Sequence, residues 1–161
     1  MKTQGVMLLF VFLLFVPGLL CAGNTGFELK YESLTGALGV LKDTDRGAVS
    51  QAIEYIKQGQ NSLALARLAE LNQNNPGNSS LRILASYALL QVGNMIGAFE
   101  EAQKAESAAN GNAYKCWFLA KVALLAGKSA VCEREVGHLK KAGAMTAEVR
   151  QLETEMKARR N

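Results

Sequence analysis

Residues 89–98, Leu-Leu-Gln-Val-Gly-Asn-Met-Ile-Gly-Ala, contain the pattern that decides the fold. An apolar helical stretch ends at Gly93, and a small residue, Ala98, follows five positions later. A glycine can adopt the left-handed backbone conformation that ends one helix and turns the chain into the next. Because a small residue after such a turn lets two antiparallel helices approach closely, this stretch predicts a helical hairpin.

The same pattern recurs on both sides with a period of 34 residues, at Gly59 and Gly127. The small residues after the three turns are Ala64, Ala98 and Cys132, those facing them on the first helices are Ala52, Ser86 and Ala120, and the later second-helix positions are Leu71, Ala105 and Leu139. Since several positions share one phase, the sequence predicts tandem helical hairpins over 45–78, 79–112 and 113–146.

The two flanks of this array are less regular. Residues 147–161 predict a C-terminal capping helix, with one apolar stripe and an otherwise charged surface; the stripe is Val149, Leu152 and Met156. For residues 24–44 two alternatives stand. The helical spacing of Leu34, Ala37, Leu38 and Leu41 favours a capping half-repeat, whereas Gly36 and Gly39, each costing about 1 kcal/mol inside a helix, favour a partly irregular lead-in.

The hairpins resemble the tetratricopeptide repeat family. Lys57-Gln58-Gly59 is similar to the inter-helix turn of that family, Tyr55 to its first-helix aromatic residue and Pro76 to its closing proline. The later repeats depart from the pattern, with Asn110 and Thr146 at the proline position. The resemblance implies an all-α fold, a right-handed α-solenoid of about three helix-turn-helix repeats plus the capping helix.

Residues 1–23 have the layout of a secretory signal peptide. Lys2 is followed by the apolar run 6–16, then by Pro17-Gly18 and the small residues Ala22 and Gly23. The run is shorter than the roughly 20 residues that span a membrane. We therefore expect an exported protein, periplasmic or secreted. Membrane attachment is expected only through an uncleaved signal or a lipidated Cys21, although Leu20 before that cysteine is larger than lipoprotein processing prefers.

Composition and the reactive side chains argue against several functions. The net charge of +4 is mild and its carriers are interspersed, so no nucleic-acid partner is expected. His138 is the only histidine, and no metal-ligand spacing or cofactor motif is found. Folding at Gly127 puts Cys116 and His138 at one height, but a packed thiol beside a surface histidine is the favoured interpretation. The chain is therefore expected not to be an enzyme and to bind no cofactor.

The same folding offsets Cys116 from Cys132 by roughly 9 Å along the helix axis. This exceeds the roughly 7 Å limit between the α-carbons of a disulfide. We therefore expect two reduced, packed thiols.

By resemblance to the family, the first helices line a concave face that binds a protein or peptide segment. The expected lining is Val49, Ile53, Lys57, Ile83, Tyr87, Gln91, Tyr114, Trp117, Lys121 and Leu125. Trp117 and Tyr87 are expected to face solvent, while the aliphatic residues could instead complete the packing between helices. This lining predicts a partner with apolar anchors and some acidic residues. The alternative is a structural subunit that self-assembles through its repeat ends into an oligomer or fibre.

Overall fold

The computed structural model describes residues 28–34, 38, 41–107 and 112–160, and no strand occurs among them. The elements are η1 (Tyr31–Ser33), a 3-10 turn, and the helices α2 (Asp43–Lys57), α3 (Asn61–Asn74), α4 (Ser79–Gln91), α5 (Met95–Ser107), α6 (Ala113–Leu125), α7 (Ser129–Lys141) and α8 (Thr146–Arg160). The predicted all-α class is confirmed. The expected signal peptide 1–23, with Cys21, lies outside the described residues.

The turn glycines of the sequence pattern have the predicted backbone conformation. Gly59, Gly93 and Gly127 have φ values of 73°, 80° and 71°. At Gly93 the N–H of the glycine bonds to Leu90 O at 3.0 Å, and the N–H of Asn94 bonds to Leu89 O at 2.9 Å. This pair of bonds is the Schellman motif, which satisfies carbonyl groups at a helix end. A fourth such turn, at Gly143 with φ 61°, connects α7 to α8.

Small residues bring the two helices of each hairpin together. The small residues predicted to face one another are all fully buried: Ala52 and Ala64, Ser86 and Ala98, Ala120 and Cys132. In the middle pair the Ser86 hydroxyl donates a hydrogen bond to the Ala98 carbonyl at 2.7 Å. A polar side chain is therefore accommodated where the helices are closest, because its hydroxyl has a partner.

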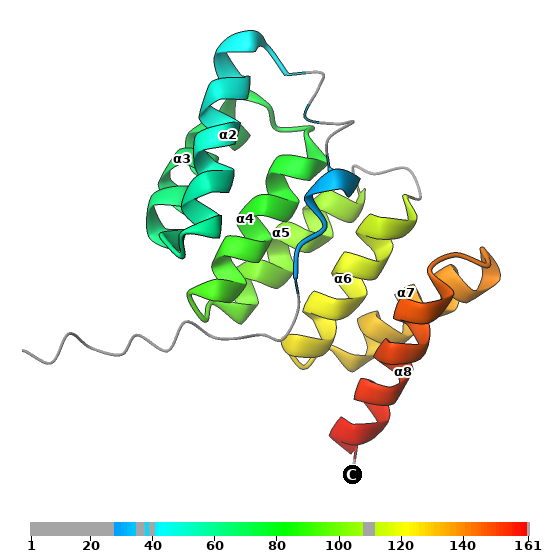
Figure 1. Cartoon of the computed structure of the whole chain (residues 1–161). Coiled ribbons are helices and arrows are strands. Elements are labelled where there is room, and N and C mark those ends of the chain that lie inside the picture. Colours follow the sequence, from blue (N-terminus) through cyan, green and yellow to red (C-terminus); the bar gives the residue numbers. More distant parts are fainter. Residues whose placement is uncertain (1–27, 35–37, 39–40, 108–111, 161) are drawn as a thin grey trace, which may run out of the picture.

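Helices adjacent in sequence pack on one another, and α2 also contacts α4, as α6 contacts α8. Figure 1 shows α2, α4 and α6 side by side, in cyan, green and yellow. The face formed by α2, α4, α6 and α8 is called the first-helix face below. None of the described helices is both long enough and apolar enough to cross a membrane.

The last helix, α8, packs against α6 and α7 through its apolar stripe. Val149 and Leu152 are buried, and Met156 is partly buried. Lys140 Nζ of α7 contacts Glu153 of α8 at 2.8 Å, and Arg159 donates to Leu124 O at 2.6 Å. The apolar stripe predicted from sequence therefore packs as expected, and α8 supplies polar side chains beside α6.

Residues 28–34 form a segment that we call the strap. It runs extended to the η1 turn and crosses the first-helix face in front of α4 and α6, as the blue segment in Figure 1 shows. Leu29 and Leu34, at its two ends, are 3% and 0% exposed. Gly36, Ala37 and Gly39, which bear on the choice between a capping half-repeat and an irregular lead-in, lie outside the described residues, so both alternatives for 24–44 stay predictions.

Candidate functional site

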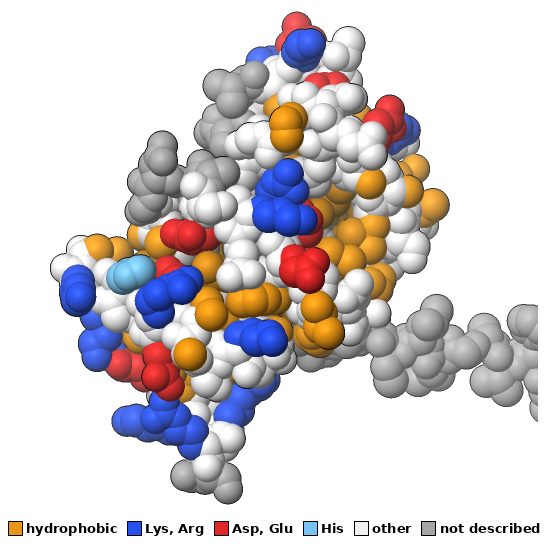
Figure 2. Space-filling view, turned by 180° about the vertical axis from the view of Figure 1, so that it is seen from behind, with side chains coloured by type: hydrophobic (Ala, Val, Ile, Leu, Met, Phe, Trp, Pro, Cys, Tyr) orange, Lys and Arg blue, Asp and Glu red, His pale blue; other side chains and the backbone are white. Residues whose placement is uncertain are grey.

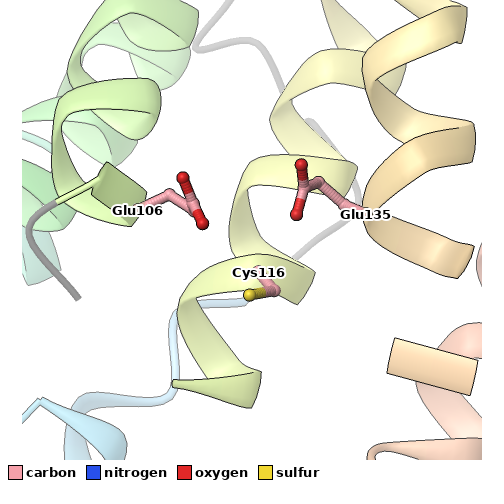
Figure 3. A group of neighbouring side chains, drawn as sticks. All are labelled: Glu106, Cys116 and Glu135. Carbon is pink, nitrogen blue, oxygen red and sulfur yellow. The ribbon is translucent and has the colours of Figure 1, made fainter. Parts of the chain in front are cut away.

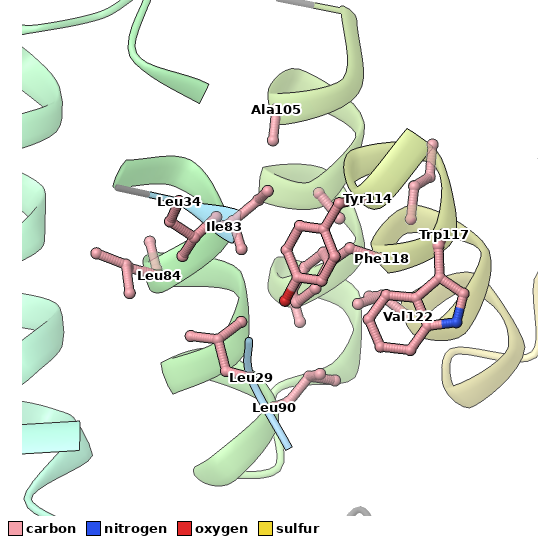
Figure 4. Packing of buried hydrophobic residues seen from close by; sticks show 14 of the residues in the cluster. Leu29, Leu34, Ile83, Leu84, Leu90, Ala105, Tyr114, Trp117, Phe118 and Val122 are labelled. Atoms are coloured by element: carbon pink, nitrogen blue, oxygen red, sulfur yellow. The ribbon is translucent and has the colours of Figure 1, made fainter. Parts of the chain in front are cut away.

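The strap is anchored to the first-helix face by its two leucines. Leu29 and Leu34 belong to the same hydrophobic cluster as Ile83 and Leu90 of α4. Figure 4 shows both leucines among side chains of α4 and α6. Fully burying a leucine stabilises by about 1.5–3 kcal/mol, so these anchors are the main apolar contribution to holding the strap.

Polar contacts of Lys30 connect the strap to two helices. Its backbone N–H donates to the Tyr114 hydroxyl oxygen of α6 at 3.0 Å. Its ammonium group lies 2.8 Å from Glu148 Oε1 of α8 and 5.8 Å from the ring centroid of Trp117. A single strap residue therefore makes a main-chain hydrogen bond, an ion pair and a cation–π contact.

Three tyrosines gather where the strap meets the helices. Burial raises the pKa of Tyr31 and of Tyr114 to about 12, and it also raises the pKa of Tyr87. At Tyr114 the hydrogen bond from the Lys30 backbone opposes this rise in pKa without cancelling it. The phenols are consequently protonated at neutral pH, and they can donate and accept hydrogen bonds but offer no nucleophile.

The predicted lining residues lie on this face, but most of them are covered. Buried are Val49, Ile83, Tyr114, Trp117 and Lys121; half-buried are Ile53, Tyr87, Gln91 and Leu125; only Lys57 is exposed. The fully buried Ile83 fits the packing role left open for the aliphatic residues. Lys57 Nζ lies 5.4 Å from the ring centroid of Tyr31, so even this lysine contacts the strap.

The prediction that Trp117 faces solvent is wrong. Its side chain is 8% exposed and packs against Tyr114 with ring centroids 5.4 Å apart. Tyr87 is half-buried instead of solvent-facing. The solvent-facing prediction assumed that this face is empty, whereas Lys30 lies across it and contacts the Trp117 ring.

Lys121 does not offer a free positive charge. It is 5% exposed, and its ammonium group lies 2.7 and 2.5 Å from the two carboxylate oxygens of Glu155 on α8. A buried lysine needs such a counter-charge. The expectation of acidic residues in a partner therefore loses its main support, because Lys121 is already paired with Glu155.

A pocket of about 330 Å3 remains between the strap, α6 and α8. Its lining includes Lys30, Trp117, Lys121, Gln151 and Glu155. The lining predicted from sequence did not include Lys30 or the α8 residues. Glu155, however, lies 34 residues after Lys121, which is one period of the sequence pattern. The period is therefore the sequence feature that relates the two residues of this ion pair.

Both remaining cysteines are buried and free, as the offset between them predicted. Burial raises the pKa of Cys132 to about 11 and also raises that of Cys116, where the carboxylates of Glu135 and Glu106 contribute as well. His138, the pale blue side chain on the face seen in Figure 2, is exposed and lines a pocket with Cys116, in accord with the predicted common height. Among the described residues, Glu106, Cys116 and Glu135 have possible metal-ligand atoms that lie within 4.8 Å of one another. Their spacing in the sequence did not predict this group.

Comparison with known proteins gives no relative: no family model, no curated protein and no solved structure matches this chain.

Proposed function

We propose that this protein is an exported, non-catalytic scaffold that holds an extended segment of another protein on its first-helix face. In this proposal the three hairpins form a right-handed α-solenoid of tetratricopeptide type, capped by α8, and the first-helix face is its concave side. Support for export comes from the N-terminal sequence pattern alone, and support for the repeats from the 34-residue period together with the recurring glycine turns.

The observation that carries the proposal is the strap itself. A short segment of the chain lies on this face, with the η1 turn between two apolar anchors, Leu29 and Leu34, and with a main-chain hydrogen bond to Tyr114. A partner segment with two apolar residues at the same spacing has the side chains to replace these anchors. In the recognition of peptide segments, main-chain hydrogen bonds supply affinity and pockets for side chains supply specificity.

The binding event is therefore a competition between the strap and the partner. A partner that displaces the strap regains the burial of two leucine-like side chains, and the pocket of about 330 Å3 beside Trp117 accepts a further side chain. Because the ion pairs of Lys30 with Glu148 and of Lys121 with Glu155 nearly balance the charge here, the anchors of the partner are expected to be mainly apolar.

A labelled peptide with the sequence of residues 28–34 provides a first test. The Leu29→Ser, Leu34→Ser double variant weakens the internal strap and should bind this peptide at least about tenfold more tightly than the unaltered chain. The matched control is Leu63→Ser, which changes an exposed leucine of α3 away from the strap. Fluorescence anisotropy measures the affinities, and equal binding by all three proteins would contradict the proposal.

Capture of natural partners provides the second test. The strap-weakened variant, immobilised, should retain more of a specific protein from the native envelope or secreted fraction than the unaltered chain does. Adding Tyr87→Glu places a charge beside Tyr31 and Tyr114 and should abolish this gain. A partner retained equally by all these proteins would bind elsewhere on the molecule.

Self-assembly is the second candidate, favoured by one specific observation. Leu63 is 53% exposed on α3 and lines a shallow pocket with Tyr55 and Arg67 at the outer side of the first hairpin. If copies associate there, light scattering after size-exclusion chromatography will show an oligomer that Leu63→Lys converts to a monomer. A monomer at high concentration rejects this candidate.

A further inference from the structure

Donor groups from three helices converge away from the strap. The carboxylates of Glu106 on α5 and Glu135 on α7 and the thiol of Cys116 on α6 have donor atoms that all lie within 4.8 Å of one another. Figure 3 shows the two carboxylates on either side of α6, with the sulfur below them. Glu135 is 1% exposed and Cys116 is 7% exposed, so this cluster is interior to the fold.

Of the two carboxylates in the cluster, Glu135 has an ion-pair partner among the described residues and Glu106 has none. Glu135 Oε1 is 2.7 Å from Arg134, while Glu106 forms no hydrogen bond or ion pair with any described residue. The Cys116 thiol has no hydrogen-bond partner on another described residue, although more than nine-tenths of this residue is buried. Two carboxylates beside a buried thiol repel one another, and burial in low dielectric strengthens that repulsion.

A pocket gives solvent access to two of these donor residues, Glu106 and Cys116. About 290 Å3 in volume, it is lined by Glu106, Cys116 and His138. His138 Nδ1 is already 3.3 Å from Glu135 Oε2, and the His138 side chain is 57% exposed, so rotation of this side chain can bring an imidazole nitrogen to the cluster. The cluster therefore holds sulfur, nitrogen and oxygen donors around one accessible hollow.

We propose that Glu106, Cys116, Glu135 and His138 bind one Zn2+ ion. Thiolate, imidazole and carboxylate are the ligands that zinc takes in proteins, four at a time in tetrahedral geometry. Bond lengths of about 2.0–2.3 Å require donors roughly 3.3–3.8 Å apart, so small side-chain rotations complete the site from the present separations. Ca2+ and Mg2+ prefer an all-oxygen shell, which the Cys116 sulfur excludes.

Binding changes both charge and mechanics at this junction. Cys116 loses its proton to solvent when the sulfur coordinates the ion, so affinity rises with pH. The ion neutralises the repulsion between the carboxylates and connects α5, α6 and α7, which belong to the second and third hairpins. The apo protein is consequently expected to melt at a lower temperature than the zinc form.

Calorimetric titration of the tag-free, chelator-treated full chain with Zn2+ tests the site. The expected result is one ion per chain, with affinity weakened at least about tenfold by Glu106→Gln and about a hundredfold by Cys116→Ser. The matched control is Cys132→Ser, which removes the other buried thiol and should leave zinc affinity unchanged. Far-UV circular dichroism verifies the fold of each variant. If Cys116→Ser does not fold, the zinc affinity of Glu106→Gln, which changes a residue at the pocket edge, is the deciding measurement.

Titration with Co2+ identifies the sulfur ligand directly. Coordination by a thiolate produces a near-ultraviolet charge-transfer band, which should appear in the unaltered chain and in Cys132→Ser but not in Cys116→Ser. The proposal is overturned if the chain takes up no Zn2+, if the band persists without Cys116, or if Glu106→Gln binds Zn2+ as tightly as the unaltered chain. These outcomes are independent of peptide binding at the strap.

Discussion

The hydroxyl oxygen of Tyr114 accepts a hydrogen bond from the backbone N–H of Lys30 at 3.0 Å, between residues 84 positions apart in the chain. This bond fixes the strap against α6 through its main chain, so it is independent of the Lys30 side chain. The adjacent ion pair of Lys30 with Glu148 is half-exposed at the lysine and contributes little by comparison.

Tyr114→Phe removes the acceptor of this bond while keeping the ring. We expect a loss of about 0.5–1.5 kcal/mol in unfolding free energy and faster hydrogen exchange at the Lys30 amide, because that N–H then has no partner in the protein. Urea denaturation and exchange monitored by NMR measure the two effects. Tyr55→Phe, on α2 away from the strap, is the control, and unchanged Lys30 exchange in Tyr114→Phe would show that the bond is not formed in solution.

Glu155→Gln tests the buried lysine. Without the carboxylate, Lys121 keeps a charge in a site where it is 5% exposed, and we expect a loss of about 3 kcal/mol in unfolding free energy. Adding Lys121→Met removes the stranded charge and should restore most of that loss. A loss of less than about 1 kcal/mol in Glu155→Gln would contradict this prediction, because ion pairs that are screened by solvent contribute no more than that.

Gly93→Ala and Gly47→Ala should change stability in opposite directions. Neither added methyl group meets an atom within 4 Å, so steric contact is excluded as a cause. Gly93 has φ +80°, where a side chain costs about 1–2 kcal/mol. Gly47 lies within α2, where alanine is favoured over glycine by about 1 kcal/mol. Thermal denaturation of both variants measures this contrast, and destabilisation by Gly47→Ala would refute the assignment of that residue to a helix.

Alkaline pH should loosen the strap. The pKa values of Tyr31 and Tyr114 rise from 10.0 in the unfolded chain to about 12 in the fold, so the protonated phenols favour the folded state. Their contribution to stability is complete below pH 10 and is lost as pH increases from 10 to 12. Urea midpoints measured across this range should fall less steeply in a Tyr31→Phe, Tyr114→Phe variant than in the unaltered chain, and parallel curves would count against buried phenols.

The helical hairpins could be predicted from sequence because their determinants are local. A glycine such as Gly93 and a small residue five positions later specify a turn and a close helix contact within one short stretch. The contact between Lys121 and Glu155 was also accessible in principle, since the two residues stand one repeat period apart.

The strap and the donor cluster could not be predicted in this way. Leu29 lies in the short alternating stretch Phe27-Glu28-Leu29-Lys30-Tyr31, which is too short to name a packing partner, so nothing local indicates that it covers α4 and α6. Glu106, Cys116 and Glu135 come from three helices, and their convergence depends on how those helices are rotated about their axes. The hydrophobic pattern of the helices therefore predicted the first-helix face, but it contained no information on the strap that covers this face.

Residues 35–42 join the strap to α2, so in the binding event proposed above the strap competes for the first-helix face as a covalently attached ligand. Short linkers give effective concentrations in the millimolar range. A free segment with the same intrinsic affinity must therefore reach about millimolar levels to displace it, whereas one with additional anchors succeeds at much lower concentration. Under the proposed binding, the covalent connection therefore sets the affinity that a partner segment must exceed to be selected.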